Sequence, residues 1–233
     1  MSAALRWLPQ GTVYGALLNF RREWDLWAPQ MAQAPYKAAP QAPVLYIKTA
    51  NTFAPCGTAI AVPDEVDVGA TLGLVIGGFE EKLPPALAES AQAATKKEAG
   101  GLHRIAGCVL LNDLSLPHAS YYRPPIKFRN RDGFLGCGPV LQAVPDLSTL
   151  ALELRINGTL AQRIELSTLV RDAATLLRDV SEFMTLQAGD VLMLGTDCLP
   201  DGTRPRAKAG DRIEISAPGF APLVHTLVEE KAT

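Results

Sequence analysis

The chain has 233 residues, 48% of them hydrophobic, and a net charge of -2. That length and apolar content suit one large soluble domain, or one domain with a small appendage. A slightly acidic chain lacks the basic excess of a nucleic-acid-binding surface, so we expect no nucleic-acid partner. No run of about 18 apolar residues and no signal-peptide pattern is present, so we expect no membrane partner and a cytoplasmic location.

Two short elements are predicted near the start of the chain. Residues 11–20, GTVYGALLNF, are typical of a strand, and residues 21–31 are expected to form a short helix. Residues 30–43 are rich in Ala, Gln and Pro, which resist regular pairing, so they are predicted to be a linker or mobile loop. We therefore divide the chain into a small strand–helix segment with its loop, residues 1–40, and a larger domain, residues 41–230.

From residue 44 the pattern changes to short apolar runs rich in β-branched residues and bounded by Gly, Pro, Asn or Asp, which is typical of strands. The predicted strands are residues 44–48, 58–62, 71–77 and 105–111. Between the last two, the Ala-rich residues 83–100 begin with Pro and end with Gly, which predicts one exposed helix.

The C-terminal third predicts one helix and two further strands. Apolar residues recur at helical spacing over residues 166–180, which indicates an amphipathic helix. Gly-Asp precedes an alternating apolar run in residues 187–195 and again in 208–216, which predicts a turn followed by a strand. Residues 199–210 contain Gly and basic residues without Walker spacing, so we expect a hairpin or loop. The elements together predict a β-rich α+β fold without the βαβ alternation of a doubly wound sheet.

Cysteine and histidine spacings indicate no metal or nucleophile motif. The cysteines form no C-x-x-C pair, so we expect reduced, buried thiols. They are Cys56, Cys108, Cys137 and Cys198. No histidine lies in a Ser/His/Asp or H-x-x-x-H arrangement, so each is expected to be a surface or locally bonded residue. They are His103, His118 and His225.

Residues 112–134, NDLSLPHASYYRPPIKFRNRDGF, gather positive charge in a nearly neutral chain. The cations are Arg123, Lys127, Arg129 and Arg131. In an extended chain the last three would point the same way and would repel one another, so they need an anion or acidic partners. A dicarboxylate or tricarboxylate fits, because Arg offers a planar fork for carboxylate. A solvated basic edge strand paired with surface acids is an equal alternative.

Asp113 follows the apolar run 105–111, so it is expected at the C-terminal end of a strand. Side chains at strand ends commonly face a site, although an Asp there is more often a turn or cap residue.

Several segments, in this order, resemble the fumarylacetoacetate hydrolase family. They are YIKTANTFAPCGTAIAVP, GATLGLVIG, AGCVLLNDLSLP with YYRPPIKFRNRDGFLGCGP, and FMTLQAGDVLMLGT with AKAGDRIEISAPGF. The resemblance runs from about Gly11 to Val228 and is closest to the N-terminal half of two-half members that isomerise and decarboxylate in homoprotocatechuate (4-hydroxyphenylacetate) breakdown. It implies a β-rich α+β fold with a mixed β-roll or sandwich and a few helices, a metal-dependent site for 2-oxo or enol carboxylates, and dimeric assembly.

The chain departs from the family pattern where metal ligands are expected. Active members carry two glutamates in E-x-E-L-x-x-V-I-G, and the matching positions here are Gly69 and Thr71, so only Asp113 remains as a metal-ligand candidate. Mg²⁺ prefers several charged oxygens, so we expect no metal, or weakly bound Mg²⁺ or Mn²⁺. Arg129 stands where active members place a lysine, and it can clamp a carboxylate but cannot readily act as a base.

The resemblance leaves three functions open. The first is a subunit of an isomerase/decarboxylase acting on 2-oxo or enol di- and tricarboxylates, with Asp113 and Arg129 as catalytic residues. The candidate substrate-binding residues are Lys48, Tyr122, Arg123, Lys127 and Thr196. The second is a metal-free, non-catalytic partner of a homologous metal-bearing chain, and the third is an acylpyruvate-type hydrolase. The expected partners are a small carboxylate and either a second copy or such a homologous chain.

Overall fold

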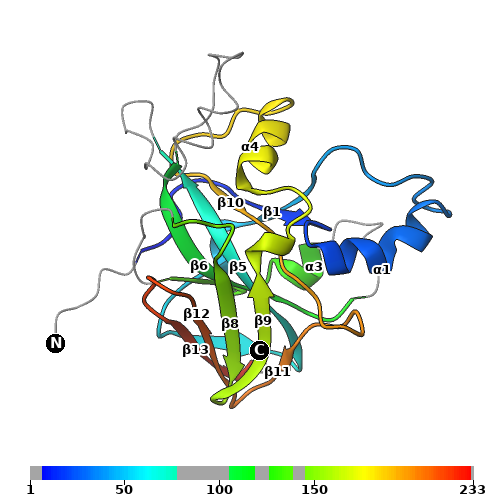
Figure 1. Cartoon of the computed structure of the whole chain (residues 1–233). Coiled ribbons are helices and arrows are strands. Elements are labelled where there is room, and N and C mark those ends of the chain that lie inside the picture. Colours follow the sequence, from blue (N-terminus) through cyan, green and yellow to red (C-terminus); the bar gives the residue numbers. More distant parts are fainter. Residues whose placement is uncertain (1–6, 78–104, 119–125, 139–144, 232–233) are drawn as a thin grey trace.

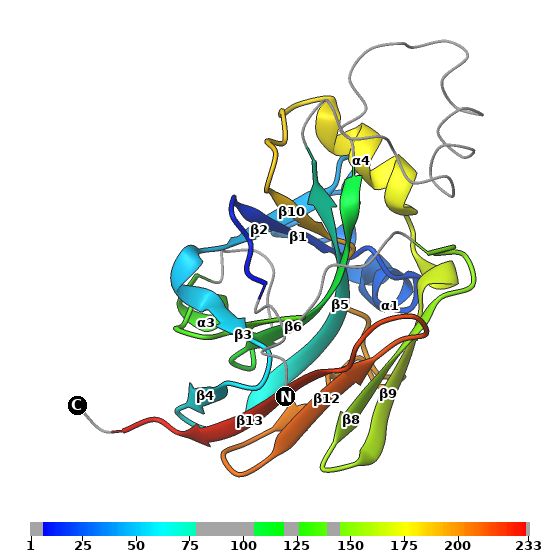
Figure 2. The same ribbon diagram turned by 90° about the vertical axis from the view of Figure 1, so that its left-hand side faces the viewer.

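The computed structural model describes residues 7–77, 105–118, 126–138 and 145–231. In this part of the chain strands predominate and form two sheets, with a few helices beside them (Figure 1). Turned by 90°, the smaller sheet lies alongside the long strands β5 and β6 (Figure 2). The structure confirms the expected β-rich α+β class. The predicted helix at residues 83–100 lies outside the described residues.

The larger sheet has the order β2-β1-β10-β5-β6-β7-β3, and β11 also pairs with β5. Its strands are β1 (Val13–Leu17), β2 (Val44–Lys48), β3 (Phe53–Pro55), β5 (Val66–Ile76), β6 (Ile105–Ser115), β7 (Leu135–Cys137), β10 (Val191–Met193) and β11 (Arg206–Ala207). β5 and β6 are a long antiparallel pair, in which Gly69 lies opposite Asp113. β1 lies between β2 and β10, so the first strand is integral to this sheet. The domain boundary near residue 40 stays a prediction.

The smaller sheet has the order β4-β13-β12-β8-β9. Its strands are β4 (Ala59–Val62), β8 (Ala151–Ile156), β9 (Thr159–Glu165), β12 (Arg212–Ser216) and β13 (Leu223–Glu229). β8 and β9 form a hairpin whose two turn residues, Asn157 and Gly158, have φ of 52° and 82°. Asn-Gly tolerates positive φ at both positions, and such a turn matches the twist of the flanking strands.

The helices of the described residues are short. They are α1 (Arg21–Met31), α3 (Ile126–Arg129) and α4 (Ala173–Ser181), with single 3₁₀ turns η1 (Ala50–Thr52) and η2 (Leu166–Thr168). The bounds predicted for α1 are confirmed. None of the described helices is long and apolar enough to span a membrane.

The helix predicted over residues 166–180 is wrong in its first half. Only α4, from Ala173, is α-helical, and it begins where the Asp172 side chain accepts a hydrogen bond from the Thr175 N–H at 2.8 Å. Before this cap, Leu169 forms an isolated bridge with Phe20. The apolar residues before Asp172 therefore contribute through the 3₁₀ turn η2 and the extended backbone that follows it, which the helical spacing alone did not reveal.

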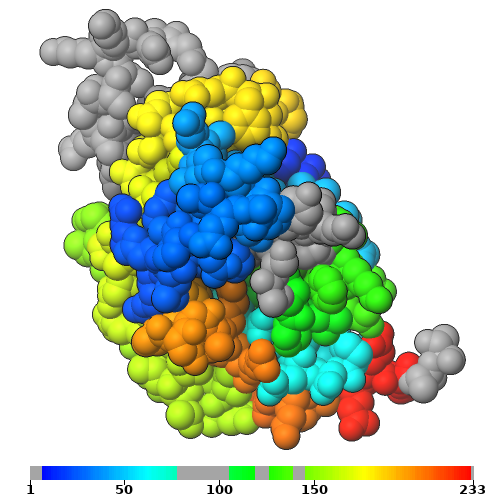
Figure 3. All heavy atoms as spheres, turned by 90° about the vertical axis from the view of Figure 1, so that its right-hand side faces the viewer, coloured from blue at the N-terminus to red at the C-terminus, as the bar shows by residue number. Residues whose placement is uncertain are grey.

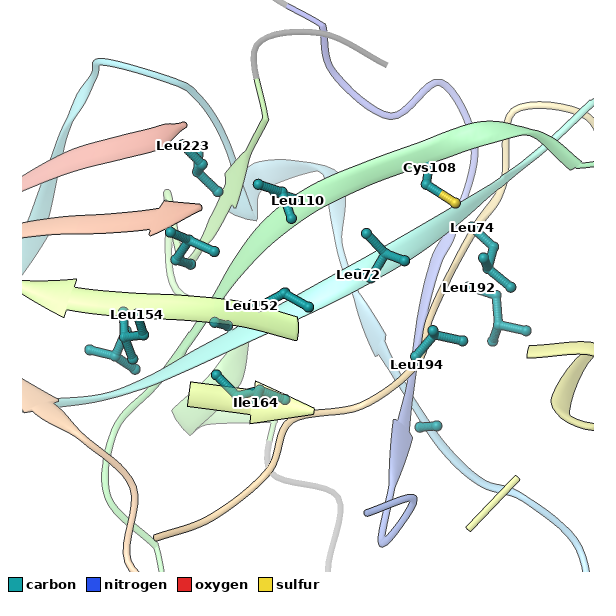
Figure 4. Packing of buried hydrophobic residues seen from close by; sticks show 14 of the residues in the cluster. Leu72, Leu74, Cys108, Leu110, Leu152, Leu154, Ile164, Leu192, Leu194 and Leu223 are labelled. Carbon is teal, nitrogen blue, oxygen red and sulfur yellow. The ribbon is translucent and has the colours of Figure 1, made fainter. Parts of the chain in front are cut away.

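The main core lies between the two sheets. Leu72 and Leu110 from the larger sheet pack with Leu152 and Ile164 from the smaller one (Figure 4). A second apolar cluster covers the opposite face of the larger sheet, and its members are Val13, Val75, Val109, Leu111, Leu135, Cys137, Val191 and Met193. Because β5 and β6 are covered on both faces, their apolar runs are continuous rather than alternating. Polar side chains on the second face are therefore buried.

Candidate carboxylate-binding site

Asp113 lies on the second face of the larger sheet, within β6. The sequence placed it at the end of a strand, where a side chain can face a site or serve as a turn or cap residue, but β6 continues to Ser115 and pairs with β5 throughout. The strand is longer than predicted because the polar residues after Leu111 still face buried surroundings on both sides. Asp113 is 3% exposed, so its charge must be balanced by nearby groups.

Lys48, the last residue of β2, supplies one balancing charge. Its ammonium nitrogen lies 2.8 Å from Asp113 Oδ1, and it donates to the carbonyl oxygens of Leu114 at 3.1 Å and Arg129 at 2.5 Å. Three oxygen atoms thus surround the ammonium group, two of them as hydrogen-bond acceptors and the third as the partner in an ion pair. These contacts compensate the charge of Lys48, although the residue is only 1% exposed.

Arg129 supplies the other charge. Its Nη1 lies 3.0 Å from Asp113 Oδ2, and its guanidinium carbon lies 4.5 Å from the centre of the Tyr46 ring. Its Nε is a buried donor without a hydrogen-bond partner among the described residues. A buried guanidinium with donor capacity left over is a suitable binding group for an anion.

The predicted convergence of residues 127, 129 and 131 is wrong. The segment is helical at α3 rather than extended, so Lys127 is exposed while Arg129 is buried. Arg131 points elsewhere and forms an ion pair with Glu230 at 2.6 Å. Tyr122 and Arg123 lie outside the described residues.

Tyr46 completes the cluster and was not predicted from the sequence. Its hydroxyl donates a short hydrogen bond to Asp113 Oδ2. A Cβ at Gly15 would lie 2.2 Å from Tyr46 Cζ, which is too close, so glycine at that position makes room for the phenol. The available signal was the spacing of two between Tyr46 and Lys48 in a predicted strand, which places both side chains on one face. We call Tyr46, Lys48, Asp113 and Arg129 the Asp113 cluster.

The electrostatics of the Asp113 cluster favour an anion. Burial opposes ionisation of Asp113, but Lys48 and Arg129 lower its pKa below the usual value. Burial lowers the pKa of Lys48, and Asp113 opposes that change. Burial, followed by the charge of Asp113, raises the pKa of Tyr46 well above its ordinary value, so the phenol stays protonated. With one carboxylate against two cations, the cluster carries an excess of one positive charge when both cations are protonated.

Gly69 and Thr71, which stand where the family pattern has glutamates, offer no ligands for a divalent cation. Thr196 Cγ2 lies 2.5 Å from the point that a Cβ at Gly69 would occupy, so its methyl group fills that space. The Thr71 hydroxyl donates to the Gly195 carbonyl at 2.6 Å. Within the described ranges, no group of three or more His, Cys, Asp or Glu side chains is placed to hold a metal. Asp113 alone, already contacted by two cations, is a poor donor set for Mg²⁺ or Mn²⁺.

Thr196 connects this face to a second charged group. Arg204, in the loop between β10 and β11, donates to Thr196 Oγ1 from Nε at 3.2 Å and from Nη2 at 3.0 Å. Nη2 also lies 2.6 Å from Oε1 of the buried Glu23 of α1. The sequence predicted only a loop here, and Arg204 had no motif to mark it.

The histidines and the cysteines were not candidates for this site, and His103 lies outside the described residues. His225 is buried, with Nε2 3.1 Å from the carbonyl oxygen of Pro55, which is distant in sequence, and His118 stacks on Phe128 at 5.5 Å. All cysteines are free thiols, and Cys56 is partly exposed while the others are buried.

The family model described as fumarylacetoacetate (FAA) hydrolase C-terminal matches residues 12–228, so the chain belongs to this family. It is 38% identical over 225 residues to the 4-hydroxyphenylacetate degradation bifunctional isomerase/decarboxylase of Escherichia coli, covering 95% of this chain and 48% of that protein. The Salmonella dublin protein of the same name is 36% identical over 223 residues, with the same two shares of 95% and 48%. The chain thus spans about half the length of these relatives.

Solved structures share the fold. The 5-carboxymethyl-2-hydroxymuconate delta-isomerase from Mycobacterium smegmatis matches with a TM-score of 0.72 and 24% identity, covering 98% of this chain and 83% of that one. Maleylpyruvate hydrolase from Sphingobium sp. SYK-6, solved with manganese(II) and pyruvate, matches with a TM-score of 0.65 and 20% identity, covering 96% and 72%. These likenesses confirm the expected fold.

Proposed function

We propose that this chain is a subunit of an isomerase/decarboxylase of 4-hydroxyphenylacetate (homoprotocatechuate) breakdown, and that it binds its 2-oxo or enol carboxylate substrate with side-chain cations instead of a full set of metal ligands. The similarity to the bifunctional relatives supports the reaction class. One observation carries the proposal for the site, namely that Lys48 and Arg129 flank Asp113 on the face where metal-dependent members are expected to place their carboxylates.

In this proposal the cations perform the electrostatic work of the reaction. Moving a double bond along a 2-oxo or enol acid passes through an enolate, whose negative charge is stabilised by fixed positive groups in a site with little water. Lys48 is held by Asp113 and two backbone carbonyls, and Arg129 by Asp113, so the two cations need little reorganisation when that charge develops.

In this proposal Tyr46 and Asp113 form the acid–base pair. The phenol is the donor and the ionised carboxylate the acceptor in their hydrogen bond. A positioned acid and base are sufficient for isomerisation, whereas decarboxylation also requires an electron sink. The arrangement therefore favours isomerisation as the step of this chain.

Isomerisation of 2-hydroxyhepta-2,4-diene-1,7-dioate by the EDTA-treated chain, followed by ultraviolet absorbance, tests the proposal. We expect turnover that added Mg²⁺ changes less than twofold, and a loss of roughly 100-fold in Arg129→Ala, within the range for a group that stabilises developing charge. Arg163→Ala, in an exposed ion pair on β9, is the matched control and is expected to keep full activity. Turnover that appears only with Mg²⁺, or that survives in Arg129→Ala, would contradict the proposal.

A second candidate is a non-catalytic partner of a homologous, metal-bearing chain or segment. It is favoured by the closed arrangement of the cluster, since three oxygen atoms surround the Lys48 ammonium group and both oxygens of Asp113 are contacted by cations. A buried ion cluster of this kind can serve structure alone. Co-expression with a family member that carries the E-x-E pair tests it. The partner function predicts co-purification and an increase in that chain's activity that Arg129→Ala in this chain leaves unchanged.

A further inference from the structure

Two buried polar side chains from different sheets, Asn112 of β6 and His225 of β13, meet in the main core. Asn112 lies two residues after Leu110, and His225 lies two residues after Leu223, so each shares a strand face with its leucine. Both leucines belong to the main core between the sheets (Figure 4). In the space-filling view, β13 (red) lies beside the cyan segment that includes its partner strand β4 (Figure 3). The His225 side chain is nevertheless enclosed, since the residue is 1% exposed.

Gly136 of β7 lies beside both side chains. It is directly opposite Asn112 in the β6–β7 register. A Cβ at this glycine would lie 2.7 Å from His225 Nδ1 and 3.1 Å from Asn112 Cβ. Because both atoms are close to one point, the distance between them is at most about that spanned by two hydrogen bonds through one water molecule. A side chain at position 136 would occupy this space, so glycine leaves room for the imidazole ring.

Three polar atoms of this pair have no hydrogen-bond partner among the described residues. They are both amide atoms of Asn112, Nδ2 and Oδ1, and Nδ1 of His225. In contrast, His225 Nε2 lies 3.1 Å from the Pro55 carbonyl oxygen, so Nε2 carries the ring proton and Nδ1 presents a lone pair. Burial lowers the pKa of His225, although the Pro55 carbonyl opposes the change, so the ring is neutral. Buried polar atoms without partners are costly, and a common partner would satisfy all three.

We propose that Asn112 and His225 bind a buried water molecule that bridges the two sheets. A water can accept from the Asn112 amide N–H and donate to the amide oxygen, while its second proton is donated to His225 Nδ1. These three hydrogen bonds are the usual number for a buried water. The bridge ties β6 to β13 inside an otherwise apolar core, directly before Asp113 in the chain. This inference does not depend on the proposed function.

Magnetic relaxation dispersion of water oxygen-17 tests the proposal in solution, because it counts water molecules that stay inside a protein long enough to tumble with it. We expect the wild-type amplitude to exceed that of Asn112→Leu, a change of similar volume, by the equivalent of about one water molecule. Thr226→Val is the matched control, since Thr226 is exposed on the same strand, and it should keep the wild-type amplitude. Equal amplitudes in the wild type and Asn112→Leu would overturn the inference and indicate direct contact between the two side chains.

The protonation of the His225 ring gives a second test that needs no variant. Long-range proton–nitrogen NMR distinguishes a ring nitrogen that carries a proton from one that presents a lone pair. We expect a protonated Nε2 and an unprotonated Nδ1 at neutral pH, and a protonated Nδ1 would overturn the inference, because the water would have no acceptor on the ring. Should Asn112→Leu not fold, His225→Phe removes the other partner and should lose the same relaxation amplitude, and an unchanged amplitude would again overturn the inference.

Discussion

Lys48 and Asp113 form an ion pair 2.8 Å long in which neither side chain is more than 1% exposed. Removing two charges from water is costly, and the cost is offset only when the geometry and the surrounding hydrogen bonds are good. Here Arg129, Tyr46 and two backbone carbonyls complete the arrangement. The pair therefore affects both the free energy of unfolding and the net charge that the Asp113 cluster presents to a ligand.

Neutralising Asp113 should strongly destabilise the fold. In Asp113→Asn, Lys48 and Arg129 stay buried without a counter-charge, and breaking a buried ion pair costs about 3–5 kcal/mol. Urea denaturation measures the change in the free energy of unfolding. Glu165→Gln, which removes an exposed ion pair with Arg163, is the matched control and should cost less than about 1 kcal/mol. Equal losses in the two variants would mean that the Asp113 cluster is not stabilised as described.

The contribution of Asp113 should disappear in acid. Burial opposes its ionisation, but Lys48 and Arg129 hold its pKa below the usual value. A carboxyl group whose pKa is lowered in the folded state stabilises the protein above its unfolded pKa, about 3.9, and loses that contribution as the pH falls through the lower folded value. The difference in unfolding free energy between wild type and Asp113→Asn should be constant from about pH 5 to 8 and shrink below about pH 4. If the difference shrank already near neutral pH, the pKa of Asp113 would not be lowered in the folded state.

Tyr46→Phe isolates one hydrogen bond of the cluster. The ring that lies under the Arg129 guanidinium is retained, but the bond to the Asp113 carboxylate is lost, which should cost about 1.5–3 kcal/mol. Because that bond also helps to lower the pKa of Asp113, the acid midpoint of stability should move to higher pH. Tyr14→Phe is the control, since Tyr14 packs against the main core on the other face of the sheet. No shift of the acid midpoint in Tyr46→Phe would show that the bond does not act on Asp113.

A double-mutant cycle tests the contact between Gly69 and Thr196. Gly69→Ala places a Cβ 2.5 Å from Thr196 Cγ2 and 3.0 Å from the Asp113 carbonyl, and such overpacking should cost about 1–3 kcal/mol. Thr196→Ser removes the methyl group but keeps the hydroxyl that Arg204 contacts. The double variant should recover at least about 1 kcal/mol relative to the sum of the single changes.

The control for that cycle is Gly69→Ala combined with Thr168→Ser, at an exposed threonine, where additive effects are expected. Additivity in the Gly69 and Thr196 pair would mean that the methyl group does not occupy the space of the missing glutamate. For the same reason Gly69→Glu alone should not restore a metal ligand, because the Thr196 methyl group occupies the space that the new side chain needs.

The sequence was informative where a pattern has a single structural meaning. The helix at residues 21–31 and the strand at residues 44–48 were predicted with the bounds observed. The continuous apolar runs of β5 and β6 were recognised as strands, but their ends were not, because strands buried on both faces also carry polar residues such as Asp113 inside the ladder.

Only part of the site could be predicted from the sequence. Asp113, Arg129 and Lys48 were candidates, and the structure brings them together. Lys127 was grouped with Arg129 on the assumption of an extended chain, but the two lie in the single helical turn α3, which points their side chains to different sides. Tyr46 and Arg204 were missed because their place depends on long-range pairing, between β2 and β1 for Tyr46 and between the loop after β10 and α1 for Arg204. No local pattern encodes such contacts.

The most direct test of the central claim is a calorimetric titration of the EDTA-treated chain with Mn²⁺ and with 2-oxoheptanedioate, separately and together. The excess positive charge around Asp113 and the blocked position at Gly69 predict no saturable Mn²⁺ binding below about millimolar concentration. They also predict dioate binding that is independent of Mn²⁺ and lost in Arg129→Ala. Micromolar Mn²⁺ binding, or dioate binding that requires Mn²⁺, would contradict the account and indicate a conventional metal-dependent site.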